Sequence, residues 1–151
     1  MKKIDIASAL ARRGSGYPPP HDAACAARLR RRLGEAGGLT TFGVNHLTLP
    51  PGAWSSQRHW HSHEDEFVWV VFGEVVLVTD AGEEVLQAGD CAAFKAGAPD
   101  GHHLINRSDE NVILLEVGNR DAADRTVYAD IDMVAEPGEE IFRRKDGTPL
   151  P

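Results

Sequence analysis

The sequence has no long apolar run, because no stretch of eighteen consecutive apolar residues occurs in it. A membrane-spanning helix needs about that length. The segment from Met1 to Arg13 contains basic residues, but its apolar part is too short and too interrupted for a secretory signal. We therefore expect a cytoplasmic protein without a membrane partner.

Cysteine is scarce as well, with only Cys25 and Cys91 in 151 residues. Two distant cysteines in a chain of this kind more often remain reduced thiols than form a disulfide. Cys91 lies in a segment that we expect to be a buried strand. Both cysteines are interpreted as structural thiols.

Basic side chains are outnumbered, with 16 lysines and arginines against 23 acids and a net charge of −7. This balance argues against a nucleic-acid partner, which must have its phosphates neutralised. Glycines at phosphate-loop or dinucleotide spacing are also missing. One basic cluster stands out: Arg28, Arg30, Arg31 and Arg32. Leu29 and Leu33 flank it four residues apart, so the preferred interpretation is the solvated face of a short helix, and the alternative is a phosphate or partner site.

The chain is most simply one domain with an irregular beginning. Pro18 to Pro20 break regular structure, so residues 1–20 are expected to form an extended arm. Residues 21–33 are rich in Ala and Arg and predict a short helix, which Gly34 would end. Short β-like runs follow: 39–49, 55–62, 66–72, 74–79, 83–87, 91–94, 102–106, 112–117 and 125–132. Such regular spacing predicts an all-β sandwich or barrel.

Two local patterns refine this prediction. Gly82 lies in a hairpin turn between two β-like runs, which predicts antiparallel neighbours. Residues 67–72 and 75–78 do not alternate with polar residues, so both faces of these strands should be covered. Either the N-terminal arm or a second subunit could cover the outer face, and we expect a homodimer.

Ligand-type side chains are concentrated between Gly52 and Gly73. His59 and His61 are two residues apart, so on a strand both imidazoles point to the same side. Four residues then leave room for a bend that returns Glu66 to the same place. His63 is ambiguous, because the bend redirects it toward a supporting or surface position.

These residues resemble the first motif of the cupin superfamily. That motif begins with Gly and continues with His-x-His, a spacer, Glu, six further residues and a final Gly. The second motif is matched at Gly89, Gly97, His102 and Asn106. Lys95 stands where the family usually has Pro, and two extra residues precede His102. The resemblance covers about residues 40–120. It implies an all-β, double-stranded β-helix (jelly-roll) barrel over 39–135, with the arm and short helix of 1–38 packed on it and a tail of 136–151.

The resemblance also implies one divalent transition metal, such as Zn, Mn, Fe or Ni, in the mouth of the barrel. Its expected ligands are His59, His61, Glu66 and His102, a nitrogen and oxygen set that suits such ions and leaves positions for water or substrate. His103 is the alternative to His102, which is favoured by its distance from Asn106.

Three more residues are candidate proton carriers or substrate contacts near the mouth: His63, Lys95 and Asp100. Residues in mouth loops are also often plain surface residues.

Three functions remain open. The first is a metal-dependent isomerase, epimerase or lyase for a small polar metabolite such as a sugar, a sugar phosphate or a hydroxy or keto acid. The chain resembles single-domain bacterial cupins likened to sugar-phosphate isomerases, a likeness at the level of the fold. The second is a non-haem iron dioxygenase. The third is a non-enzymatic module that binds a small molecule in the barrel mouth.

Overall fold

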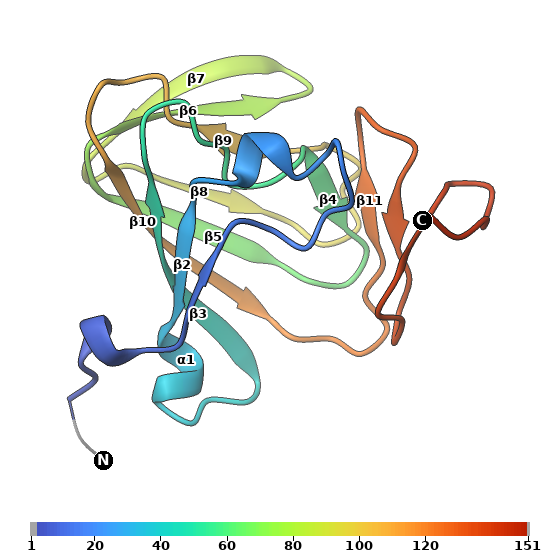
Figure 1. The fold of residues 1–151 in the computed structure, drawn as a ribbon, viewed down its shortest axis with the longest axis horizontal. Helices are drawn as coiled ribbons and strands as arrows, with labels where there is room; N and C mark the ends of the chain where they lie inside the picture. Colours follow the sequence, from blue (N-terminus) through green and yellow to red (C-terminus); the bar gives the residue numbers. More distant parts are fainter. Residues whose placement is uncertain (1–2, 151) are drawn as a thin grey trace.

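The computed structural model describes residues 3–150, which form two facing layers of strands (Figure 1). Short 3-10 helices cover Ile6–Ser8 and Ala23–Cys25, and the one α-helix of the described chain, α1, is Leu33–Ala36. The strands are β1 (Ala11–Arg13), β2 (Leu29–Arg32), β3 (Phe42–Leu49), β4 (His59–His61), β5 (Glu66–Phe72), β6 (Glu74–Thr79), β7 (Gly82–Gln87), β8 (Cys91–Phe94), β9 (His103–Ile105), β10 (Val112–Asn119), β11 (Thr126–Tyr128), β12 (Val134–Ala135) and β13 (Phe142–Arg143).

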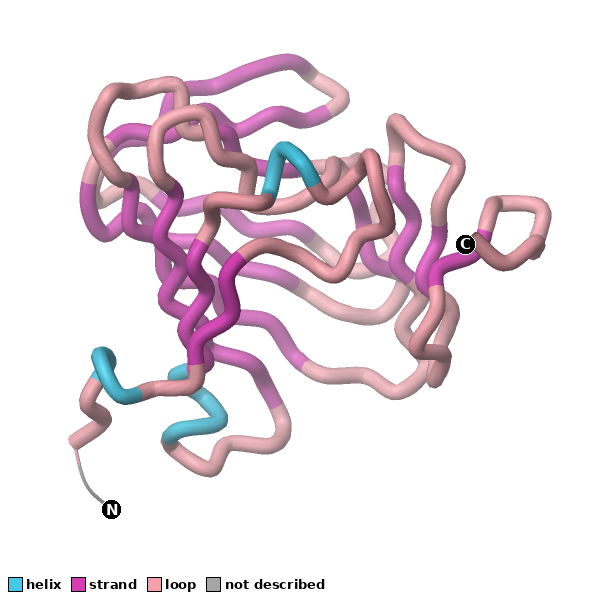
Figure 2. The backbone as a smooth tube through the Cα atoms, viewed as in Figure 1, coloured by secondary structure: helices cyan, strands magenta, loops and turns pink. Residues whose placement is uncertain are grey.

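One layer is a six-stranded sheet in the order β1-β2-β3-β10-β5-β8, with every neighbouring pair antiparallel. The other layer combines the sheets β7-β6-β9 and β13-β12-β11-β4. An isolated bridge between His59 of β4 and His102, directly before β9, connects these two smaller sheets. The tube in Figure 2 is accordingly dominated by strands, and its few helical turns lie in the N-terminal part of the chain. The predicted all-β jelly-roll fold is confirmed.

Two glycine-containing turns set the path of the central hairpins. The predicted turn between β6 and β7 is confirmed, because Thr79 pairs with Gly82 in an antiparallel register. Gly73 connects β5 to β6 with a φ of 84°, a left-handed conformation that side-chain-bearing residues rarely adopt. A Cβ there would also lie 3.1 Å from the carbonyl oxygen of Asn111, so the motif needs glycine at this turn.

The apolar core fills one end of the space between the layers. Its fully buried members come from both layers and include Leu47, Leu49, Val70, Val75 and Leu114. Burying side chains of this size stabilises the fold by about 1.5–3 kcal/mol each relative to leaving them exposed. The opposite end of the interior is lined by polar residues, which form the candidate site.

The helix predicted for residues 21–33 is wrong. The Ala-rich part forms only the 3-10 turn Ala23–Cys25, and the Arg-rich part is strand β2. Strand β2 pairs with β3 along its whole length, from Leu29 opposite Thr48 to Arg32 opposite Asn45. These sheet contacts override the helix propensity of the segment, since propensity is a weak local preference.

The interpretation of the arginine cluster as a solvated helix face is wrong for two of its members. Arg28, directly before β2, and Arg30, within β2, both line the barrel interior, whereas Arg31 faces outward and donates to the carbonyl of Ala7. Arg28 is only 6% exposed.

Both cysteines are free thiols, as expected, and Cys25 is buried. Cys91 is exposed, which corrects its expected burial: it starts the edge strand β8 on the outward side. The outer face of β5 is also uncovered, with Phe67, Trp69 and Val71 exposed. The N-terminal strands β1 and β2 do not cover this face, because they extend the same sheet beyond β3, at the edge far from β5.

Among residues 3–150, no helix has the length and apolar character that crossing a membrane requires.

Candidate metal centre

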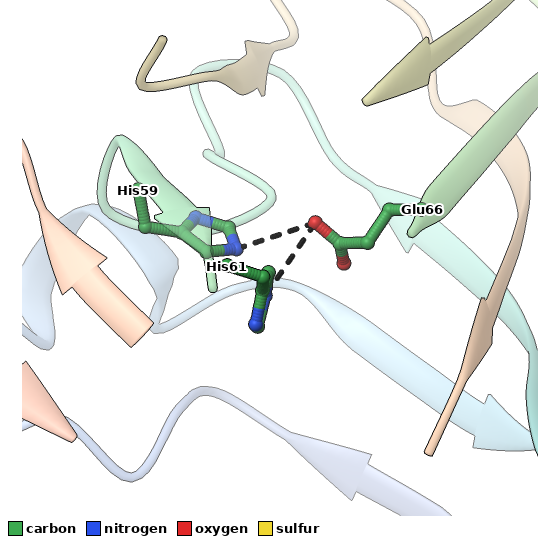
Figure 3. A group of neighbouring side chains, drawn as sticks. All are labelled: His59, His61 and Glu66. Atoms are coloured by element: carbon green, nitrogen blue, oxygen red, sulfur yellow. Dashed lines mark ion pairs between the residues drawn. The ribbon is translucent and has the colours of Figure 1, made fainter. Parts of the chain in front are cut away.

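Strand β4 and the start of β5 bring three ligand-type side chains together. His59 and His61 alternate with Trp60 on β4, so both imidazoles point into the barrel. Glu66 opens β5 after the loop of residues 62–65 and faces them. Figure 3 shows the two histidines turned toward the carboxylate of Glu66.

The ring nitrogens converge on one oxygen. The Nε2 atoms of His59 and His61 lie 3.6 Å and 3.5 Å from Oε2 of Glu66, and Nε2 of His102 lies 2.8 Å from the same oxygen. Two donors each about 2.1 Å from a shared ion are about 3.0–3.4 Å apart at octahedral or tetrahedral angles. The observed distances of 2.8–3.6 Å lie within a few tenths of an ångström of this range, and His59, His61 and Glu66 form a group that could hold one ion.

His102 and His103 point to opposite sides of their strand. His102 faces Glu66 and stacks on Phe94 at a ring separation of 3.6 Å. His103 is buried on the other side, where it packs edge-on against Trp54 and its Nδ1 lies 3.1 Å from the carbonyl oxygen of Ser56. The structure thus places His102, and not His103, at the cluster.

Hydrogen bonds hold two of the imidazoles in place. Nδ1 of His61 lies 2.6 Å from Oδ2 of Asp124, and Nδ1 of His59 lies 2.9 Å from the carbonyl oxygen of Gln57. Each bond requires the proton on Nδ1, which leaves the lone pair on Nε2 facing the cluster. Asp124 also accepts the backbone N–H of His63, so it fixes the loop that follows β4.

Sequence reasoning missed Asp124, which lies 63 residues beyond His61 in a loop. Nothing in its local sequence marks it, because the contact depends on β11 pairing with β4. A second group of possible ligands, His61, Glu64 and Asp124, lies beside the first. The hydrogen bond with Asp124 already engages Nδ1 of His61, so this second group is the weaker candidate.

The surroundings favour the metal-binding forms of His59 and Glu66. Burial lowers the pKa of His59 to about 4, because charging it would require desolvation. Burial would raise the pKa of Glu66, but the hydrogen bond with His102 and the neighbouring His59 and His61 outweigh it, and the pKa falls to about 2. Neutral imidazoles and an ionised carboxylate are the forms that bind metal ions.

The cluster opens into a cavity of about 240 Å³, and part of its wall comes from the arginine cluster, for which a phosphate or partner site was the less favoured interpretation of the sequence. Arg28 and Arg30 line it from the β2 side, and Glu116 of β10 pairs with Arg30 at 2.9 Å. Tyr17 and Tyr128 complete the wall, with their rings packed edge-on 5.4 Å apart. The Arg28-x-Arg30 spacing was the available signal, but it is informative only if the segment is a strand.

The three candidate proton carriers lie outside this cavity. His63 is exposed, and its Nδ1 lies 2.8 Å from Oγ of Ser62. Lys95 is largely exposed, with Nζ 3.8 Å from Asp65. Asp100 accepts the backbone N–H of Asp80. Lys95 and Asp100 do line a smaller cavity of about 170 Å³ that also exposes His61, Glu66 and His102, whereas His63 is not brought to the cluster.

Comparison with known proteins identifies the family. The Cupin domain model matches residues 45–118. A crystal structure from Silicibacter pomeroyi, named as a sugar phosphate isomerase from a cupin superfamily, is 47% identical with a TM-score of 0.94, over 99% of this chain and 97% of that one. The chain belongs to the cupin superfamily.

Two further solved structures are less similar to this chain. A protein from Acidithiobacillus ferrooxidans, named as a candidate sugar phosphate isomerase, is 26% identical with a TM-score of 0.74, over 83% of this chain and 81% of that one. The polyketide cyclase RemF from Streptomyces resistomycificus is 18% identical with a TM-score of 0.64, over 80% of each chain, and shares the fold. No functionally curated protein matches.

Proposed function

We propose that this cupin is a metal-dependent enzyme that acts on a small polar metabolite as an isomerase, epimerase or lyase. The proposal depends on one observation: three Nε2 atoms lie within 3.6 Å of a single carboxylate oxygen at the wall of a cavity. His59, His61, Glu66 and His102 would hold one divalent transition metal ion. The name of the relative from Silicibacter pomeroyi supports the isomerase class.

A divalent ion at this position would act as a Lewis acid on a carbonyl or hydroxyl oxygen of the substrate. The chain supplies the surroundings of that reaction. Asp124 keeps the Nε2 lone pair of His61 directed at the cluster, and Phe94 excludes water from one face of His102. The cavity of about 240 Å³ suits a small metabolite in the barrel mouth.

Proton transfer has candidates at the second opening of the cluster. Lys95 and Asp100 line the smaller cavity, which also exposes Glu66. A substrate that extended from the cluster into this cavity would contact both side chains, and either could transfer a proton to or from it. Tyr128 lies on the other side, and burial raises its pKa above the ordinary value, which keeps its phenol neutral. In that form it can orient a substrate oxygen by donating a hydrogen bond.

Elemental analysis of the purified protein, combined with a substrate panel of sugars, sugar phosphates and hydroxy acids, tests the proposal. We expect about one zinc, manganese or nickel ion per chain and turnover of one panel member. His61→Ala should lose both the metal ion and turnover. His63→Ala, the same substitution at an exposed position, should keep the metal ion and the fold.

Other outcomes would redirect the assignment. Bound iron with substrate-dependent oxygen uptake would identify a dioxygenase, which the same ligand set supports. Bound metal without turnover across the panel would indicate a small-molecule-binding module. Unchanged metal content in His61→Ala would contradict the ligand set.

A further inference from the structure

The wall of the site opposite the metal ligands carries an arginine whose charge is not matched by a carboxylate. Arg28 is 6% exposed and lines the same cavity as His59 and Glu66. Its Nε donates to the carbonyl of Gly14 at 3.0 Å. Within residues 3–150, its Nη1 is buried and has no hydrogen-bond partner. A buried guanidinium with an unused donor is costly, so an acceptor in the adjoining cavity would stabilise it, and an anionic acceptor would do so most strongly.

Arg30, in the same cavity wall, has the carboxylate partner that Arg28 lacks. Arg30 lies two residues further along the chain, in β2, and lines the same cavity. Glu116 neutralises it at 2.9 Å, with a second contact at 3.0 Å. Glu66 is occupied by the three histidines. Neither acid therefore neutralises Arg28, whose pKa is lowered by burial and by the adjacent Arg30.

A second cavity of about 290 Å³ shares Arg28, Arg30, Glu66 and Glu116 with the first, so the two adjoin. Its lining contains five arginines and four glutamates: Arg12, Arg28, Arg30, Arg32, Arg120, Glu35, Glu64, Glu66 and Glu116. Positive charge is in slight excess here although the whole chain carries −7. This nearly balanced lining does not repel anions as a strongly acidic one would.

We infer that Arg28 binds the anionic group of the substrate, a carboxylate or a phosphate, and that the substrate is therefore a small oxyanion with its reacting oxygen directed at the histidine cluster. This inference deepens the proposed function, because it names the substrate class of the same site. A planar guanidinium offers two parallel N–H donors to such a group. Tyr17, beside Arg28 in the cavity wall, would limit the size of the anion.

Isothermal titration with three probes tests the inference: inorganic phosphate, glycolate and uncharged glycerol. Each is titrated into manganese-loaded and EDTA-treated protein. We expect phosphate, glycolate or both to bind at least tenfold more tightly than glycerol, and the stronger of the two identifies the anion. The inference would be overturned if neither phosphate nor glycolate bound to the wild-type protein, whether manganese-loaded or EDTA-treated.

Arg28→Met should weaken anion binding at least tenfold while metal content stays at the wild-type level. Arg31→Met is the matched control, since Arg31 lies on the same strand but faces outward. Equal anion affinity in Arg28→Met and wild type would contradict the inference. The titration of EDTA-treated protein separates the two proposals, because Arg28 is charged whether or not a metal is bound.

Removing Arg28 also removes its bond to Gly14, so a second variant avoids dependence on its folding. Glu116→Gln leaves Arg30 without its carboxylate and adds a second unmatched cation beside Arg28. Phosphate or glycolate should then bind severalfold more tightly. Unchanged or weaker anion binding in Glu116→Gln would count against an anion site at this wall.

Discussion

The two ends of the barrel interior are built from the same strands but differ in chemistry. Strand β5 contributes Glu66 to one end and the fully buried Val70 to the other. Strand β10 does the same with Glu116 and the fully buried Leu114. Inward-facing residues at one end of the barrel therefore stabilise the fold, and those at the other end form the candidate site. Mutations at the two ends should accordingly change stability and metal binding separately.

Glu66→Gln should have the largest effect at the polar end. The change removes the carboxylate that all three histidines face. Losing a supporting hydrogen bond weakens metal binding by about 10–100-fold, and we expect the loss of this carboxylate to weaken it more than about 100-fold. Elemental analysis after dialysis measures this. Glu84→Gln, on the exposed face of β7, should retain the metal. Metal retained in Glu66→Gln would remove Glu66 from the ligand set.

Leu114→Ala tests the apolar end. Leu114 is fully buried, so the lost contacts and the remaining cavity should lower the free energy of unfolding by about 2–5 kcal/mol. Leu115→Ala, the next residue on the outward face, should cost about 1 kcal/mol. Urea denaturation measures both. Metal stoichiometry should stay unchanged in Leu114→Ala, and its loss would show that the two ends are not separable.

Asp124→Asn should weaken metal binding without removing a ligand. The amide can still contact Nδ1 of His61, but it loses the charge that orients and polarises the imidazole. We expect a decrease of about 10–100-fold in metal affinity, measured by competition with a chelating dye. Asp109→Asn, at an exposed position, is the control. A loss as large as that of Glu66→Gln would instead suggest that Asp124 binds the ion itself.

The outer face of β5 differs from both interior ends, because Phe67, Trp69 and Val71 are 41%, 45% and 48% exposed. We propose that a second copy of the chain covers this face, as a homodimer would. Trp69→Glu should then shift the protein to monomer in sedimentation velocity, with little change in metal content. A wild-type protein that sediments as a monomer at tens of micromolar would refute this.

The fold and the centre of the site could be predicted from the sequence because their signals are local. His59, His61 and Glu66 lie within eight residues, and strand alternation plus one bend brings them together. His102 follows from its distance to Asn106, which is fully buried and whose amide donates to the carbonyl oxygens of Leu49 and Glu110.

The remainder of the site depends on contacts between distant segments. Asp124 reaches His61 through the pairing of β11 with β4, and Arg28 reaches the cavity through the pairing of β2 with β3. Because residues 21–33 were predicted to be a helix, the pairing of β2 with β3, and with it the position of Arg28, could not be predicted. Ala and Arg favour a helix locally, but the unpaired edge of β3 offers hydrogen bonds that a short isolated helix cannot match.

Anomalous diffraction from a manganese- or zinc-loaded crystal tests the central claim most directly. A single strong peak is expected, about 2.0–2.3 Å from Nε2 of His59 and His61 and from a carboxylate oxygen of Glu66, with His102 as the fourth ligand. A peak between Glu64 and Asp124 instead, or no peak at the cluster under saturating metal, would contradict it.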